Sequence, residues 1–164
     1  MKGERGGFRP LRRKQLLVGL GDDAYKSKHK LHDPTRCPRC SASFHAGRWT
    51  WDAAPRGAHE QLCPACHRIE DRFPAGYVTL AGEYFRGHRD EILGLVKNCE
   101  KKEKVEHPLQ RIMAIEDAAG GVLVTTTDVH LARNIAEHVH DACKGSLVFH
   151  YSKEDNLLRA TWKR

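Results

Sequence analysis

The sequence CPRC at residues 37–40 is followed by the similar sequence CPAC at residues 63–66. These two stretches determine the fold of the first part of the chain. Each has the C-x-x-C spacing, which lets two cysteine sulfurs point at one metal ion, and 22 residues separate the pairs. Two such pairs at this distance form the ligand pattern of a tetrahedral thiolate zinc site. We therefore predict one structural zinc ion, with the ligands Cys37, Cys40, Cys63 and Cys66.

Four thiolates fill the coordination sphere of zinc and leave no open position for water, which indicates a structural ion and not a catalytic one. Residues 36–76 hold few apolar side chains, so the metal would largely determine whether this module folds. Three alternatives stay open. They are disulfides, a redox C-x-x-C pair, and covalent haem attachment at the C-x-x-C-H pattern of residues 63–67. His67 could also replace one cysteine as a ligand.

The overall composition limits the class of protein. The chain has 164 residues, of which 30% are charged and 40% hydrophobic, and this suits one ordinary soluble domain or two small ones. No stretch approaches the roughly 18–20 apolar residues of a membrane helix, and no secretory signal is evident. We expect a cytoplasmic protein without a membrane partner. Because the sequence has no phosphate-binding glycine loop, nucleophile elbow or dinucleotide fingerprint, we also expect no enzyme and no small-molecule substrate.

The positive charge is concentrated near the N-terminus. Residues 1–36 contain ten Lys or Arg and four Asp or Glu, a balance of +6, whereas the other 128 residues carry the remaining +1 of the total of +7. A basic arm on a nearly neutral body indicates an anionic polymer as partner. We expect residues 1–35 to be a largely disordered arm whose basic side chains contact RNA phosphates. These side chains are Arg5, Arg9, Arg12, Arg13, Lys14, Lys26, Lys28 and Lys30.

Aromatic and basic residues also occur together around the cysteine pairs. Aromatic rings can stack on unpaired bases while arginines contact phosphate, so we add Arg48, Trp49 and Arg68 to the candidate RNA contacts. The alternative is that Trp49 and Trp51 form the small core around the metal, and one tryptophan could serve each purpose.

The remainder of the chain is expected to form a linker and amphipathic helix over residues 77–108, and a ββαββ domain over residues 109–164. Over residues 83–106 the apolar positions recur at helical spacing, and Pro108 follows as the stop. Those positions are Ile92, Leu95, Val96 and Cys99. The predicted fold class is α+β, with a small four-cysteine zinc-knuckle module, then a helix, then a two-layer domain.

Within residues 109–164, alternating and β-branched runs predict four strands. These are 112–115, 122–127, 147–151 and 158–162. Asp128 is a natural N-cap for the helix between the two strand pairs. That helix places Leu131, Ile135, Val139 and Ala142 on one apolar face. The other face of the sheet would present polar residues such as His150, Arg159, Thr161 and Lys163. Cys99 and Cys143 are read as small core residues.

Two blocks of the chain resemble the 60S ribosomal export adaptor family, also called nonsense-mediated mRNA decay protein three. The first runs from Cys37-x-x-Cys40, through Phe44 and Gly47-Arg48-Trp49, to Cys63-x-x-Cys66-x-Arg68. The second comprises Gly120 to Asp128, then Ala132-Arg133-Asn134-Ile135-Ala136, then Gly145-Ser146-Leu147. Their order also agrees, and the resemblance spans roughly residues 36–164. Family members generally carry more cysteine pairs and, in eukaryotes, additional domains, so this chain is similar to a compact, bacterial-type relative.

The resemblance implies contact with ribosomal RNA or the large ribosomal subunit, and it matches the four cysteines to ligand positions. The expected function is therefore that of a non-enzymatic zinc protein associated with the ribosome. Its expected role lies in large-subunit maturation or in ribosome inactivation under stress. The alternative is a zinc-stabilised protein–protein adaptor that binds no nucleic acid.

Overall fold

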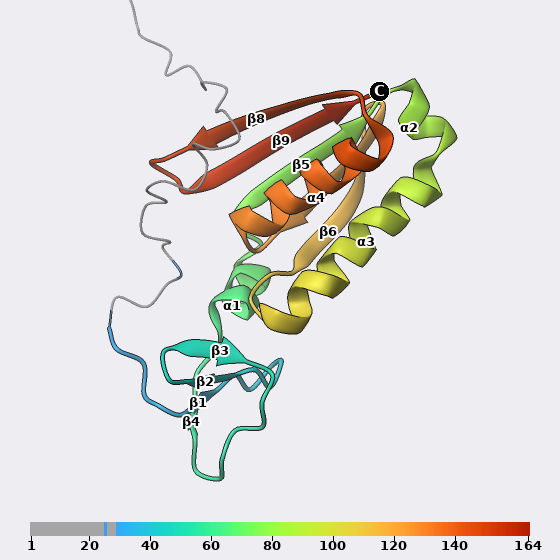
Figure 1. The fold of residues 1–164 in the computed structure, drawn as a ribbon. Helices are drawn as coiled ribbons and strands as arrows, with labels where there is room; N and C mark the ends of the chain where they lie inside the picture. The colour runs from blue at the N-terminus through green and yellow to red at the C-terminus, as the bar shows by residue number, and fades with distance from the viewer. Residues whose placement is uncertain (1–24, 26–28) are drawn as a thin grey trace, which may run out of the picture.

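The computed structural model describes Tyr25 and residues 29–164, which form two units placed end to end (Figure 1). Residues 29–75, the cysteine module, contain short strands and one helix. Residues 76–164, the αβ domain, contain a five-stranded sheet with helices. The predicted α+β class, with a four-cysteine module ahead of a two-layer domain, is confirmed.

The sheet of the cysteine module has the strand order β3-β2-β1-β4. Its strands are β1 (Thr35–Arg36), β2 (Ser43–His45), β3 (Arg48–Thr50) and β4 (His59–Glu60). Ala46 and Gly47 join β2 to β3 with φ angles of 50° and 84°. Two consecutive positive φ angles match the right-handed twist of a tight hairpin, and glycine adopts such an angle without strain.

Helix α1 (Pro64–Asp71) follows directly after Cys63, which is its N-cap residue. Pro64 stands in the first turn, where the missing N–H has no helical partner to lose and the fixed φ suits the helix. The helix ends at Arg72, whose φ of 51° is left-handed. The second C-x-x-C pair therefore lies at a helix start, where backbone N–H groups are free to donate to sulfur.

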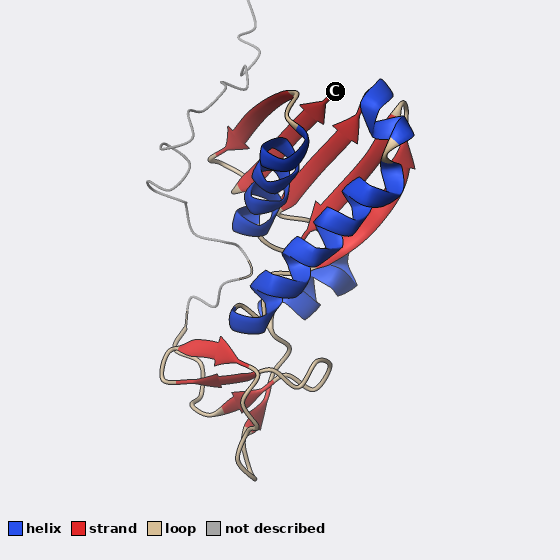
Figure 2. Cartoon of the chain, turned by 45° about the vertical axis from the view of Figure 1, so that its right-hand side comes forward, coloured by secondary structure: helices blue, strands red, loops and turns tan. Residues whose placement is uncertain are grey.

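The sheet of the αβ domain has the order β6-β7-β5-β9-β8. Its strands are β5 (Gly76–Ala81), β6 (Ile112–Ala118), β7 (Gly121–Thr126), β8 (Ser146–Ser152) and β9 (Leu157–Lys163). Its helices are α2 (Glu83–Gly87), α3 (Arg89–Glu106) and α4 (Val129–Cys143). The helices α3 and α4 lie side by side over one face of this sheet (Figure 2).

All four strands and the helix predicted within residues 109–164 are present. Asp128 caps α4 as expected, because its carboxylate accepts hydrogen bonds from the N–H groups of His130 and Leu131 at 2.8 and 3.1 Å. One detail differs, since Ala142 is exposed and the buried stripe of α4 ends at Cys143.

The central strand β5 was not predicted. It lies where a linker was expected at the start of residues 77–108, and it pairs antiparallel with β7 and parallel with β9. Its residues alternate between buried and half-buried positions along the whole strand. The expected helix over residues 83–106 is also divided at His88 into α2 and α3.

The core of the αβ domain lies between the sheet and α3 with α4. The expected stripe of α3 is buried at Ile92, Val96 and Cys99, and Leu95 packs against it. Trp162, the largest fully buried side chain, comes from β9. Burying such side chains is worth about 1.5–3 kcal/mol each, so this domain has a core of its own.

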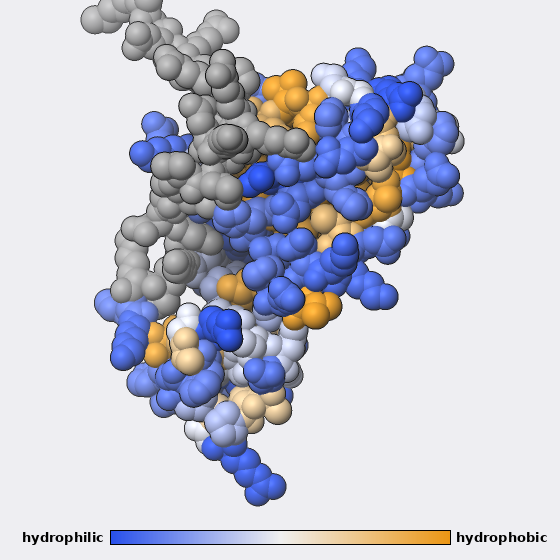
Figure 3. Space-filling model, in the orientation of Figure 1, coloured by the Kyte–Doolittle hydropathy of each residue, from blue (hydrophilic) through white to orange (hydrophobic). Residues whose placement is uncertain are grey.

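The opposite sheet face carries polar side chains, and Arg159, Thr161 and Lys163 are exposed there as expected. In the view of Figure 3, polar residues cover most of the described surface and apolar ones form small areas. Within Tyr25 and residues 29–164, no helix has the length and apolar character needed to cross a bilayer.

Candidate metal centre

The four predicted ligand cysteines meet at one point of the cysteine module. The sulfur atoms of Cys37, Cys40, Cys63 and Cys66 all lie within 4.8 Å of one another. None of the six cysteines forms a disulfide, and Cys99 and Cys143 are buried in the αβ domain as expected. The prediction that the two C-x-x-C pairs converge on one site is therefore confirmed.

The pairing of β1 with β4 explains why the cysteine pairs meet. These two strands are parallel neighbours, so their carboxyl ends lie at the same edge of the sheet. Cys37 follows β1 at once, and Cys63 follows β4 after two intervening residues. The Gln61 N–H donates to the Arg36 carbonyl at 3.1 Å and extends this pairing toward the site.

Backbone hydrogen bonds shape each pair into a knuckle. In the first, the Cys37 N–H donates to the Ala42 carbonyl at 2.8 Å, and the Ser41 N–H donates to the Cys37 carbonyl at 3.0 Å. In the second, the Cys66 N–H donates to the sulfur of Cys63 at 3.4 Å. The Cys63 N–H in turn donates to the sulfur of Cys37 at 3.3 Å and links the two knuckles.

The sulfur geometry suits a tetrahedral metal ion. Zinc–sulfur bonds of about 2.3 Å place neighbouring sulfurs of a tetrahedron about 3.8 Å apart. The sulfurs of Cys40 and Cys63 lie 3.8 Å apart. An all-thiolate set is soft, and it is the donor set of structural zinc and of iron–sulfur centres. The four cysteines are thus positioned to coordinate a metal ion.

The local electrostatics differ among the thiols. Burial raises the pKa of Cys63 and of Cys66. Burial acts in the same direction on Cys37, but hydrogen bonds from backbone N–H groups, led by that of Cys63, outweigh it and lower its pKa to about 7. The N–H groups that surround Cys37 therefore favour its thiolate, the form that binds metal.

A residue that sequence analysis missed, Arg111, lies against the same sulfurs. Its guanidinium donates to the sulfur of Cys40 at 3.1 Å and to that of Cys66 at 3.2 Å, with Cys63 at 3.8 Å. Only 7% of Arg111 is exposed. Burial acts to lower its pKa, but the hydrogen bonds to the sulfurs prevail and raise it. A buried cation in this position fits an anionic metal–thiolate cluster.

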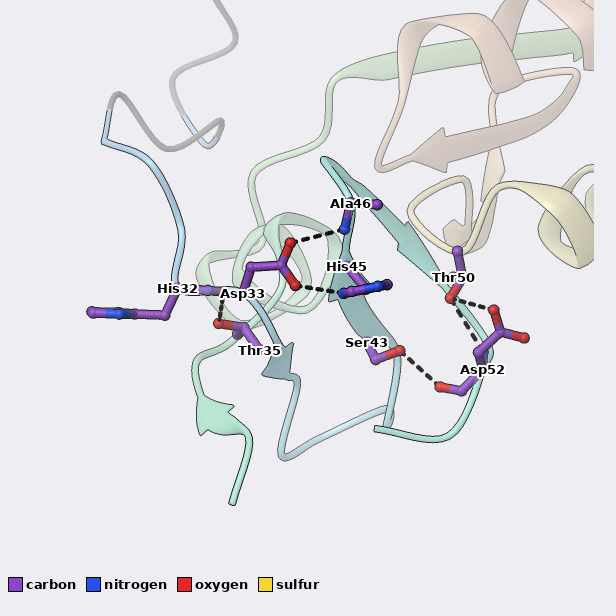
Figure 4. Close-up of polar contacts among 8 residues, drawn as sticks. All are labelled: His32, Asp33, Thr35, Ser43, His45, Ala46, Thr50 and Asp52. Carbon is purple, nitrogen blue, oxygen red and sulfur yellow. Dashed lines mark hydrogen bonds and ion pairs between the residues drawn. The ribbon is translucent and has the colours of Figure 1, made fainter. Parts of the chain in front are cut away.

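Polar contacts stabilise the outer part of the cysteine module (Figure 4). Nδ1 of His45 lies 2.6 Å from one carboxylate oxygen of Asp33, and the Ala46 N–H donates to the other at 2.9 Å. The hydrogen bond with His45, followed by that from Ala46, lowers the pKa of Asp33. The Ser43 hydroxyl donates to the Asp52 carbonyl at 2.7 Å. These contacts join the segment before β1 and the loop after β3 to the β2–β3 hairpin, in a module whose apolar core is small.

The predicted RNA contacts fall into three groups. Seven arm residues lie outside the described residues, namely Arg5, Arg9, Arg12, Arg13, Lys14, Lys26 and Lys28. Lys30 and Arg48 are described and exposed. Trp49 is half-buried and packs on the cysteine cluster, whereas Trp51 is 39% exposed and its ring contacts Arg111 and α3 of the αβ domain.

The prediction that Arg68 contacts RNA is wrong. This residue is buried, with 3% exposure. Its guanidinium donates to the Phe73 carbonyl at 3.0 Å and lies over the Tyr25 ring at 4.4 Å. The side chain therefore packs at the C-terminal end of α1 and bonds to the chain that follows it, and its charge is not available to a ligand.

The position of His67 argues against two of the open alternatives. It is half-exposed on α1, its Nε2 lies 3.5 Å from Asp71, and it is outside the sulfur cluster. Haem attachment would use only the second cysteine pair, whereas here the first pair lies at the same point. One metal shared by four sulfurs accounts for both pairs.

The chain was also compared with known proteins. No family model, no curated protein and no solved structure matches it. The case for a metal centre in this chain therefore depends on the convergence of its four sulfur atoms and on the buried cation beside them.

Proposed function

We propose that this protein is a non-enzymatic zinc-binding protein that associates with ribosomal RNA or the large ribosomal subunit in the cytoplasm. The observation that carries the proposal is the converged four-sulfur site, which would hold together a small module directly after a strongly basic arm. The resemblance to the 60S ribosomal export adaptor family directs the proposal to the ribosome.

Zinc is the preferred ion because it binds four thiolates without a redox partner and tolerates a fully closed tetrahedral site. Its role would be structural. The closed sphere leaves no position for a substrate or an activated water molecule, which supports a role other than catalysis. Iron is the alternative outcome of metal analysis.

RNA is the preferred partner because of the distribution of charge. Residues 1–36 carry +6, and the rest of the chain is close to neutral at +1. Phosphate contacts dominate the affinity of such arms and make it depend steeply on salt. Lys30 and Arg48 are exposed on the cysteine module and would extend the basic surface of the arm onto it.

Cosedimentation with purified ribosomes at two salt concentrations tests the proposal. We expect wild-type protein in the large-subunit fraction at low salt and its release at high salt. Replacing Arg9, Arg12 and Arg13 by Gln should reduce the slope of log affinity against log salt by about 2–3. The matched control replaces three exposed α3 lysines by Gln, and it should leave the slope unchanged. These are Lys97, Lys101 and Lys102.

Equal effects of the two triple variants would contradict a role for the arm. Absence from every ribosomal fraction at low salt, together with nucleic-acid-free purified protein, would contradict RNA binding and favour the protein–protein adaptor.

A further inference from the structure

We propose that Arg111 is an outer-sphere positioning residue of the metal centre, which compensates the charge of the thiolates and fastens the cysteine module to the αβ domain. This inference depends on the zinc binding proposed above. It goes beyond the four ligands, because Arg111 comes from the other unit of the protein.

The guanidinium of Arg111 contacts both cysteine pairs. Its two terminal nitrogens donate to different sulfurs, one to Cys66 at 3.2 Å and the other to Cys40 at 3.1 Å. Arg111 thereby spans both knuckles, since Cys40 belongs to the first and Cys66 to the second. The planar fork of arginine suits such a two-point contact, whereas lysine offers a single compact ammonium group.

The charge of Arg111 needs a buried anion. Arg111 is almost fully buried, and none of the carboxylates in residues 29–164 lies within ion-pair distance of it. A buried cation without an anionic partner is strongly unfavourable. Zinc with four thiolates has a formal charge of roughly −2, and it supplies the anion that this arginine lacks. The cation and the cluster therefore stabilise each other.

Hydrogen bonds within the αβ domain hold Arg111 in place. Its N–H donates to the Thr127 hydroxyl at 2.9 Å, and the Thr127 N–H donates to the Arg111 carbonyl at 2.9 Å. Its Nε–H donates to the Pro108 carbonyl at 2.7 Å. These partners are Pro108, in the segment between α3 and β6, and Thr127, the residue directly after β7. The αβ domain thus fixes the orientation of the side chain that reaches the sulfurs.

Trp51 adds a second connection at the same place. Its ring lies 5.5 Å from the Arg111 guanidinium, and its indole N–H donates to the Lys104 carbonyl of α3 at 2.6 Å. The metal site, Trp51 and Arg111 therefore form one continuous contact from the cysteine module to α3 and β7. Metal binding and the attachment of the two units should depend on each other.

Hydrogen bonds to a thiolate also withdraw electron density from its sulfur. Without Arg111 its sulfurs would hold more electron density, so they should transfer charge to a bound metal more easily. The negative cluster would also lose its compensating cation, so zinc should bind less tightly. Outer-sphere partners of this kind typically account for 10–100-fold in metal affinity. The charge-transfer energy is a property of the sulfurs themselves, so a residue that only fills space would not change it.

The experiment measures zinc affinity by chelator competition, and the sulfur-to-cobalt charge-transfer band of Co²⁺-substituted protein, on the full chain. We expect Arg111→Met to weaken zinc binding by about 10–100-fold and to shift the band to lower energy. Arg111→Lys should show a smaller change in the same direction. The control is Arg89→Met, which removes an arginine paired with Asp117 in the same domain. It should match wild type.

If Arg111→Met fails to fold, Arg111→Lys decides the question. Wild-type affinity together with a wild-type band in the Arg111 variants would overturn the inference while leaving the metal centre intact. A wild-type chain that binds neither zinc nor Co²⁺ would instead overturn the proposed zinc binding, and this inference with it.

Discussion

Replacing Cys63 by serine should damage the metal site and leave the αβ domain folded. Cys63 is fully buried, and its sulfur accepts a hydrogen bond from the Cys66 N–H at the start of α1. A serine hydroxyl is a poor zinc ligand at neutral pH, because it must lose its proton to bind. The substitution therefore removes one of four ligands, while the serine hydroxyl can still accept the Cys66 N–H as an N-cap of α1, so the loss is that of the ligand.

The expected loss of zinc affinity equals the part of the binding free energy that one ligand contributes. Structural zinc in small modules contributes about 10–16 kcal/mol of binding free energy, which is also folding free energy. One of four equivalent thiolates then accounts for about 2.5–4 kcal/mol, or roughly 100–1,000-fold in zinc affinity. The αβ domain has its own core around Trp162 and should keep its stability.

Chelator competition gives the affinity, and the indole N–H signals in NMR spectra report on each unit. Trp49 packs on the cysteine cluster, whereas the Trp162 indole N–H donates to the Lys144 carbonyl at 2.5 Å inside the αβ domain. In Cys63→Ser at limiting zinc, the Trp49 signal should move to its unfolded position while the Trp162 signal stays. The control is Cys99→Ser, which also changes a buried cysteine but should leave zinc affinity unchanged.

Wild-type zinc affinity in Cys63→Ser would refute this reasoning, because the four sulfurs would then not act as one ligand set. Equal losses in Cys63→Ser and Cys99→Ser would refute it as well, since the effect would come from general destabilisation.

Three further predictions concern the αβ domain and are measured by thermal or urea unfolding. Asp128→Ala should cost about 1 kcal/mol through the lost N-cap of α4, and Asp128→Asn should restore most of it; equal stability of the two would contradict the cap. Gly121→Ala should be strongly destabilising, because a Cβ there would meet the Leu80 carbonyl oxygen at only 1.9 Å, whereas Gly94→Ala in open space on α3 should stabilise by about 0.4–1 kcal/mol. Leu80→Ala should cost about 2–5 kcal/mol from the buried core, and Val105→Ala, at a 70% exposed position, should stay within about 0.5 kcal/mol of wild type.

Features encoded by nearby residues were predictable from the sequence. The two C-x-x-C pairs specify a metal site through their own spacing, and the structure brings them together. The N-cap at Asp128 and the alternation along β9 are also local, because they depend on hydrogen bonds within one turn and on the two-residue period of a strand.

The central strand β5 shows where local patterns are insufficient. It has six residues and begins with glycine, and its partner β9 lies about eighty positions further along the chain. Its alternation of buried and half-buried residues is a strand signal, but nothing within the segment shows that it would lie between β7 and β9. Its position depends on the whole sheet.

The arginines show the same limit for the site. Arg68 was assigned to RNA from its charge and position near a cysteine pair, but tertiary packing buries it beneath Tyr25. Arg111 is 45 positions from Cys66 and 71 from Cys40, so no spacing rule connects it to the sulfurs. Side-chain roles that depend on contacts between distant segments need the folded structure.

Elemental analysis of the purified full chain, prepared under reducing conditions and followed through chelation, tests the central claim most directly. The account predicts one zinc ion per chain, lost on chelation together with the folded signals of the cysteine module but not those of the αβ domain. A colourless protein without bound metal, whose cysteine module stays folded in excess chelator, would contradict it.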